Sequence, residues 1–218
     1  MGDILKDHRL DLLKVYNLLY NTYGPQGWWP AKSKFEIIIG AILTQQAKWE
    51  NVERAIENLK RERILSPKKL AKARINKIEK AIRCVPFYKT KAKRIKNIAR
   101  SYKTLIKKVK EGDRDYLLKT DGIGEETADS ILLYVGGKRF FVVDAYTKRI
   151  LKRIANFDGN YESIRRFFEE KLPRDVKIYK EYHALIVKHC KEICKSKPLC
   201  NKCVLNKMCN HARLQRND

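Results

Sequence analysis

The sequence predicts an all-α fold that is divided into two domains. Apolar residues recur at three- and four-residue spacing in ten segments, which is the period of amphipathic helices. No convincing alternation of apolar and polar residues indicates a strand, and residues 140–143 are too short to decide. The 218 residues are enough to bury a substantial core. The expected helical segments are 10–20, 35–43, 52–59, 75–82, 92–109, 116–118, 127–135, 145–154, 164–172 and 179–193.

Glycine and proline residues between these segments indicate turns. We expect a six-helix domain over residues 33–136 and a second domain formed by 1–32 together with 137–218. In the first domain, residues 89–110 include ten basic residues and no acidic one. Their apolar stripe predicts one long helix, whose other face is either an ordinary solvated surface or a surface that meets phosphate. The stripe consists of Ala92, Ile95, Ala99, Tyr102, Ile106 and Val109.

The chain is strongly basic, with 49 Lys and Arg against 25 Asp and Glu and a formal net charge of +24. Self-repulsion at this level is unfavourable unless a polyanion offsets it, so a nucleic-acid partner is indicated. A basic surface unrelated to binding is the alternative. No apolar run approaches the length of a membrane span, and residues 1–10 lack the apolar core of a signal peptide. We therefore expect a cytoplasmic, nucleoid-associated monomer with no membrane partner.

Residues 118–128 predict two helices joined by the turn Gly122-Ile123-Gly124. Two glycines one residue apart let the backbone turn tightly and approach another molecule closely. The second helix, which contains Thr127 and the small Ala128, then begins with outward-pointing amide N–H groups that suit an anion. These amides could hold a DNA phosphate without reading the base sequence. An ordinary tight connection between helices is the alternative.

Asp144 follows Val142 and Val143 at the expected start of another helix. The simplest role for an aspartate there is that of N-cap. The two valines would also shield its carboxylate on one side, and a capping side chain is fixed in orientation, so the two roles are compatible. Cleavage of an N-glycosidic bond develops positive charge on the sugar, which a fixed carboxylate can stabilise while it orients or deprotonates water. Asp144 is the candidate catalytic residue.

Four cysteines follow the spacing Cys194-x5-Cys200-x2-Cys203-x5-Cys209. One close pair stands centrally with an outlying cysteine on each side, whereas structural zinc sites usually show two close pairs. The pattern favours a four-iron cluster over zinc, and unliganded thiols are a third possibility. The other two cysteines, Cys84 and Cys190, lie outside this spacing and are expected to be buried apolar residues.

Aromatic residues gather near the first helices of the predicted six-helix domain. Trp28 and Trp29 precede Pro30, and Trp49 lies downstream. Each tryptophan could be a core anchor, but two adjacent ones cannot both point easily into one core, so a stacking wall for an extruded base is a second possibility. Gln45 and Gln46 end an apolar helical segment, where a glutamine could be a cap or could enter a duplex and fill the gap left by a flipped nucleotide.

Together these residues resemble the helix-hairpin-helix (HhH-GPD) DNA glycosylases, specifically the endonuclease III branch with a 4Fe-4S cluster, over nearly the whole chain. Within that superfamily, the residues around Trp28 and Gly40 are most similar to 3-methyladenine DNA glycosylase III, and an archaeal uracil-DNA glycosylase is similar in layout. The matching segments are Leu43-Thr44-Gln45-Gln46-Ala47, Phe87-Tyr88-Lys89-x-Lys91-Ala92, Gly122-Ile123-Gly124-x-x-Thr127-Ala128, Val143-Asp144, His189 and Cys194.

The resemblance implies a base excision repair enzyme that binds double-stranded DNA, flips out a damaged base and hydrolyses its glycosidic bond. The damaged base would be an alkylated purine, uracil or oxidised guanine. Asp144 would act from a cleft between the two domains, Gln45 or Gln46 would fill the duplex, and a 4Fe-4S cluster would be structural. The resemblance assigns DNA binding to Gly122, Ile123, Gly124 and Thr127, the base pocket to Trp28, Trp29, Pro30 and Trp49, and the cluster to Cys194, Cys200, Cys203 and Cys209.

Two departures from the family pattern bear on activity. Endonuclease III proper has a catalytic lysine two residues after the second hairpin glycine, where this chain has Glu126. Without that amine we expect a monofunctional glycosylase lacking efficient AP lyase activity. The first cysteine spacing is also one residue shorter than the family's usual six. The alternatives are a bifunctional glycosylase/AP lyase and a non-catalytic helix-hairpin-helix module that only binds DNA.

Overall fold

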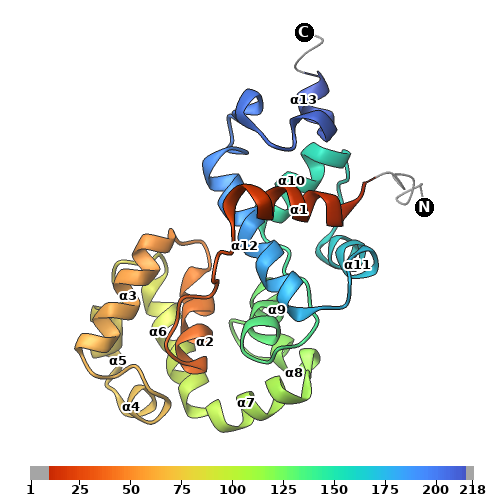
Figure 1. The fold of residues 1–218 in the computed structure, drawn as a ribbon. Helices are drawn as coiled ribbons and strands as arrows, with labels where there is room; N and C mark the ends of the chain where they lie inside the picture. Colours follow the sequence, from red (N-terminus) through yellow and green to blue (C-terminus); the bar gives the residue numbers. More distant parts are fainter. Residues whose placement is uncertain (1–9, 215–218) are drawn as a thin grey trace. The chain divides into compact units, whose positions relative to one another are not determined.

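The computed structural model describes residues 10–214 and divides the chain into two compact units. Unit 1 consists of Met1–Trp28 with Arg139–Asp218, and unit 2 is Trp29–Lys138, whereas the predicted boundaries are 33 and 136. Between residues 10 and 214 the regular structure is entirely helical, as predicted for an all-α fold (Figure 1). In the same range, no helix combines the length and the apolar character that spanning a bilayer requires.

Unit 2 contains eight helices rather than the six predicted, because two sequence expectations were wrong. A short helix begins at Pro67, between two of the expected helical segments, since Ser66 caps it and proline is tolerated at the first helical position. The single helix expected over 92–109 is two helices that meet at Ser101, whose side chain bonds the Asn97 carbonyl. The helices are α2 (Lys34–Thr44), α3 (Trp49–Arg61), α4 (Pro67–Lys72), α5 (Ile75–Ala81), α6 (Tyr88–Arg100), α7 (Tyr102–Glu111), α8 (Arg114–Leu118) and α9 (Glu125–Tyr134).

Helix α2 is the central helix of unit 2. Ile38, Ile39, Ile42 and Leu43 are fully buried, and the helix packs against α3, α6 and α9 (Figure 1). A helix that is apolar around most of its circumference must be surrounded by other elements. Ser33 begins this helix by accepting a hydrogen bond from the Glu36 amide at 3.1 Å.

The predicted helix pair around the two glycines is formed by α8 and α9. Gly122 has φ +82, a backbone conformation that favours glycine. The two helices are fastened by Arg114, which donates to both carboxylate oxygens of the fully buried Asp129 at 2.7 and 3.1 Å. A bidentate guanidinium–carboxylate pair fixes the relative orientation of its two side chains as well as their distance. The ion pair between α8 and α9 therefore helps to hold the turn that joins these two helices.

Unit 1 is built around α12, a helix of 17 residues that packs against α1 and α10 (Figure 1). Its core is aromatic: Phe141 stacks on Phe168 at a centroid distance of 4.1 Å, and Tyr182 lies edge-on to both rings. The elements are α1 (Leu12–Tyr23), α10 (Ala145–Ala155), α11 (Tyr161–Lys171), α12 (Val176–Glu192), the 3-10 turns η1 (Cys200–Lys202) and η2 (Asn206–Met208), and α13 (Asn210–Leu214).

Candidate functional site

Asp144 is the N-cap of α10, as the sequence predicts. Its Oδ1 accepts a hydrogen bond from the Thr147 amide at 2.7 Å, and its Oδ2 lies 3.5 Å from His183 Nε2. Val142 and Val143 are each 1% exposed and Thr147 is fully buried. The carboxylate is thus fixed by two partners within an apolar surrounding, although 14% of its side-chain surface still meets solvent.

The environment keeps this carboxylate ionised. Burial disfavours the charged form of Asp144, but hydrogen bonding and charge interaction with His183, together with the Thr147 amide, outweigh burial and hold the pKa of the carboxyl below its usual value. At neutral pH Asp144 therefore presents a negative charge at a defined place. A charge of this kind can stabilise a developing cation without moving.

His183 is a partner of Asp144 that the sequence analysis did not single out. It lies on α12 and is 5% exposed. The sequence contained one signal that His183 is buried: it directly precedes the apolar run Ala184–Val187. That run lies in the core, so the adjacent histidine is buried as well. Only the packing of α12 against α10 brings His183 to Asp144.

The hairpin presents two glycines in different situations. A Cβ added to Gly122 would meet the side chain of Arg94, which would have to move, and the positive φ of Gly122 itself favours glycine. Gly124, the N-cap of α9, has φ −91 and nothing within 4 Å of an added Cβ. Neither its conformation nor its neighbours in the chain call for glycine. Ile123 is buried beneath the turn, and Thr127 is 6% exposed in the first turn of α9.

The two glutamines predicted to enter a duplex have different surroundings. The Gln45 side chain is half-buried and donates from Nε2 to the Gly122 carbonyl at 2.8 Å and to Thr127 Oγ1 at 3.0 Å. Gln46 is exposed and has φ +52, which is uncommon for a residue other than glycine. The structure thus brings Gln45 to the hairpin inside unit 2 and leaves Gln46 on the surface.

Three of the four aromatic-site residues predicted from the sequence line one cavity of about 470 Å³ in unit 2: Trp29, Pro30 and Trp49. The Trp29 ring makes edge contacts with Trp49 at 5.6 Å and with Tyr134 at 5.5 Å. Gly40 permits this arrangement, since a Cβ there would lie 3.3 Å from Trp29 Cζ2. Trp28 is not among the residues that line the cavity.

The cavity also has a charged wall. The buried Glu36 carboxylate forms an ion pair of 2.7 Å with Lys60 Nζ, and both residues line the space. Aromatic faces with a few fixed polar groups are typical of sites for planar ligands.

The four cysteines of the predicted cluster all belong to the segment that follows α12. Cys194 and Cys209 are buried, whereas Cys200 and Cys203 are half-exposed beside the 3-10 turns. Of the other two cysteines, Cys190 is buried as expected, but Cys84 is half-exposed. The described residues 10–214 contain no group of three or more His, Cys, Asp or Glu side chains arranged to hold a metal ion.

Helices α10 and α12 both contact the cysteine loop. Arg153 donates from Nη1 to Cys194 Sγ at 3.2 Å, and His189 Nε2 lies 3.4 Å from Cys203 Sγ. A hydrogen bond from Cys190, aided by Arg153 and opposed by burial, lowers the pKa of Cys194, whereas burial raises the pKa of Cys203 to about 11. Thiolate is the form that binds metal, so an electropositive neighbour at Cys194 favours ligation.

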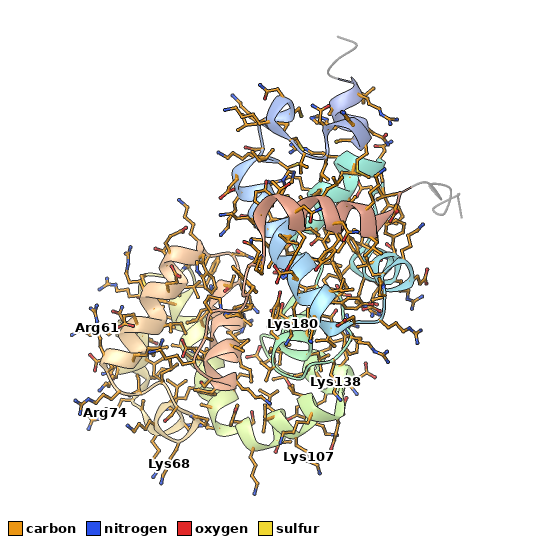
Figure 2. All side chains as sticks on the ribbon, in the orientation of Figure 1. Arg61, Lys68, Arg74, Lys107, Lys138 and Lys180 are labelled. Atoms are coloured by element: carbon orange, nitrogen blue, oxygen red, sulfur yellow. The ribbon has the colours of Figure 1, made fainter. Side chains whose placement is uncertain are left out.

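Phe87 is a second candidate that the sequence analysis did not assign. It is 65% exposed, and its φ of +56 places a bulky residue in the left-handed region directly before α6. A bulky residue at positive φ is uncommon and persists only where the surrounding structure enforces that conformation. The exposed basic residues are spread more widely: Figure 2 shows Arg61, Lys68, Arg74 and Lys107 extending outward from unit 2.

Comparison with known proteins places these features in one family. Residues 39–174 match the HhH-GPD superfamily of base excision DNA repair proteins. The chain is 44% identical, over 94% of its length and 99% of the relative, to a protein of Methanocaldococcus jannaschii named as a DNA repair glycosylase.

Two solved structures share the fold. One is the Helicobacter pylori 3-methyladenine DNA glycosylase MagIII bound to 1,N6-ethenoadenine, with a TM-score of 0.75, 31% identity and coverage of 84% of this chain and 98% of that one. The other, a trapped covalent intermediate of endonuclease III with DNA, has a TM-score of 0.81, 19% identity and coverage of 94% and 97%. The chain therefore belongs to the HhH-GPD superfamily of base excision DNA repair proteins.

Proposed function

We propose that this protein is a monofunctional DNA glycosylase that flips a damaged base out of double-stranded DNA and hydrolyses its N-glycosidic bond. The observation that carries the proposal is Asp144, a carboxylate kept ionised in an apolar surrounding by the Thr147 amide and His183. A structural N-cap alone needs only the Thr147 amide. The second, buried partner gives the carboxylate a fixed orientation suited to chemistry.

In the proposed reaction the glycosidic bond breaks, its electron pair leaves with the base, and positive charge develops on the sugar. Asp144 stabilises that charge and orients the water that attacks the sugar carbon. The carboxylate accepts a proton from this water as the new C–O bond forms. Its lowered pKa favours the charged form needed for the first task. Because His183 and Thr147 hold both carboxylate oxygens, little reorganisation accompanies bond breaking.

The base is proposed to enter the aromatic cavity of unit 2, against Trp29 and Trp49. Stacking on electron-rich rings suits an alkylated purine, and the 31% identical MagIII structure was solved with 1,N6-ethenoadenine. Uracil and oxidised guanine are the other candidate lesions, because aromatic walls accept many bases and discrimination depends on a few polar groups. Glu36 and Lys60 are such groups in this cavity.

The hairpin is proposed to hold the DNA backbone through the amides around Gly124, where the chain leaves open space. Gln46 and Phe87, both exposed on left-handed turns, are proposed to enter the duplex and fill the place of the flipped nucleotide. Gln45 was an equal candidate from the sequence, but its amide already bonds Gly122 and Thr127.

The monofunctional proposal rests on Glu126, which occupies the hairpin position of the family's catalytic lysine and is exposed on α9. A carboxylate cannot form a Schiff base with the sugar carbon. The competing proposal is a bifunctional glycosylase/AP lyase that uses another lysine of this lysine-rich chain.

Cys194, Cys200, Cys203 and Cys209 are proposed to hold a 4Fe-4S cluster, with zinc as the alternative. Four thiols on one short loop are the donor set that either site requires, and the guanidinium of Arg153 beside Cys194 favours its thiolate. When bound, the cluster would link the four cysteines to one another and so hold the loop in one conformation. The residues around it, Arg153 and His189, would orient the cysteine ligands.

A panel of duplexes with single lesions tests the function. Wild-type protein should release free base from at least one of them, and Asp144→Asn should lower the single-turnover rate by about 10²–10⁴-fold while leaving duplex affinity nearly unchanged. Borohydride with abasic DNA should trap little or no covalent adduct. Release of no base would favour the non-catalytic DNA-binding module, and strong trapping would establish the bifunctional enzyme.

A further inference from the structure

A buried lysine closes the end of helix α2. Lys91, on α6, is 2% exposed, and its Nζ donates to the Leu43 carbonyl at 2.8 Å and to the Gln45 carbonyl at 2.5 Å. Carbonyls at a helix C-terminus lack intrahelical donors and carry partial negative charge, so a cation placed there satisfies both needs. Lys91 therefore fixes the main chain where α2 ends.

The side chain of Gln45 extends the same network to the hairpin. Its Nε2 bonds the Gly122 carbonyl on one side of the hairpin turn and Thr127 Oγ1 on the other, across 77 and 82 residues of sequence. The main chain of Gln45 is thus held by α6, and its side chain is held by the hairpin. One residue joins three segments of unit 2.

Of the exposed non-glycine residues at positive φ, Gln46 and Phe87 adjoin this network. Gln46 follows Gln45 directly, and the Phe87 carbonyl accepts a hydrogen bond from the Lys91 amide at 2.9 Å. Non-glycine residues in this region of φ and ψ persist only where the surrounding structure enforces them. Lys91 contacts the turn that carries Phe87 with its main chain and the turn that carries Gln46 with its side chain.

We propose that Gln45 and Lys91 are positioning residues that fix Gln46 and Phe87 at a set distance from the phosphate-binding hairpin. This rests on the proposed DNA binding of unit 2. Neither residue needs to touch a base. Phosphate bound at the hairpin then determines where the two exposed side chains enter the duplex, so backbone binding and insertion occur together.

The test separates insertion from affinity. The DNA is a duplex with a stable abasic analogue and an adjacent 2-aminopurine, whose fluorescence rises when it is unstacked. Gln45→Met keeps the length of the side chain and removes both hydrogen bonds to the hairpin. We expect the fluorescence change to fall at least threefold, with affinity for undamaged duplex, measured by anisotropy, within about twofold of wild type.

Further variants make the result decisive. In a Gln46→Ala background, Gln45→Met should add little further loss, because positions that act through one another are not additive. Thr127→Val removes only one of the two bonds and should give a smaller loss in the same direction, which keeps the test available if Gln45→Met does not fold. Lys91→Met should lower the fluorescence change as Gln45→Met does, whereas Lys68→Met, its matched control on an exposed side chain of α4, should leave the change as in wild type.

An unchanged fluorescence signal in Gln45→Met, or a loss of signal in proportion to a loss of affinity, would overturn the proposal, because Gln45 would then only stabilise the hairpin itself. The assay needs DNA binding but no base release. Failure of the glycosylase proposal, seen as absence of free base from every lesion, is therefore distinguishable from failure of this one.

Discussion

Asp144 has one partner that is close in the sequence and one that is distant. The sequence predicts its place at the start of a helix, and the structure confirms the N-cap. The second partner, His183, stands 39 positions later and approaches only through helix packing. Pattern analysis along a chain finds local contacts such as the Thr147 amide, whereas a contact between two helices leaves no local signal.

Removing His183 should shift the pH dependence of base release. His183 helps to hold the pKa of Asp144 below its usual value, against burial. In His183→Gln the stabilising charge and hydrogen bond of His183 are lost, so the effect of burial is less opposed and the pKa of the Asp144 carboxyl rises. The acidic limb of the single-turnover rate profile should therefore move to higher pH. At neutral pH we expect a fall of about tenfold from looser orientation. Identical profiles for both proteins would show that His183 does not act on Asp144.

Lys91 should make stability depend on alkaline pH. Burial and then Arg94 lower its pKa to about 8, so between pH 8 and the ordinary lysine value near 10.4 the unfolded chain binds a proton that the folded chain does not. Stability contributed at this site should therefore rise with pH across that range, by about 2–3 kcal/mol from pH 8 to 10. Urea unfolding of wild type and Lys91→Met at both pH values measures the difference. If the difference in unfolding free energy between wild type and Lys91→Met is the same at both pH values, the pKa of Lys91 is not lowered in the folded protein.

Two elements show why boundaries were harder to predict than helices. The stripe from Ala92 to Val109 continues through Ser101 in the sequence, yet Ser101 ends α6 with φ −91 and ψ 7 and begins α7. A serine that bonds backbone carbonyls can end a helix without disturbing apolar spacing. The hairpin, in contrast, was predictable because its Gly122 has a conformation that few other residues adopt.

The two hairpin glycines should respond differently to alanine. Gly122→Ala meets Arg94 and a positive φ, so it should lower the melting temperature by several degrees and weaken DNA binding as well. Gly124→Ala has space and an ordinary φ, so its stability should match wild type. Its duplex affinity should still fall about tenfold if a phosphate approaches the backbone there. Calorimetry and anisotropy on the pair separate folding from binding, and full affinity in Gly124→Ala would contradict phosphate binding at this turn.

The cysteine loop makes a chemical prediction. Anaerobically purified protein should absorb near 400 nm and contain about four irons per chain if a 4Fe-4S cluster is bound. Cys200→Ser should reduce both, whereas Cys84→Ser, outside the loop, should leave them unchanged. Colourless protein with one zinc per chain would establish the alternative metal.

At the scale of the whole molecule, the net charge follows from the composition alone, without the structure. A formal net charge of +24 predicts that DNA affinity depends steeply on salt, because each neutralised phosphate releases counterions. With about six to ten phosphate contacts, affinity should fall about 10³–10⁵-fold between 50 and 200 mM salt. Anisotropy titrations over that range give the slope, and a nearly flat plot would mean that the basic residues do not face DNA.

The sequence by itself determined the all-α class, the hairpin turn, the capping aspartate and the four-cysteine spacing, because each depends on residues that are close along the chain. The tertiary structure alone decided that His183 meets Asp144, that Lys91 is buried at the end of α2, and that Gln45 bonds the hairpin while Gln46 stays exposed. These contacts join residues far apart in sequence. They form only when packed helices remove side chains from water and leave each buried polar group to find a partner.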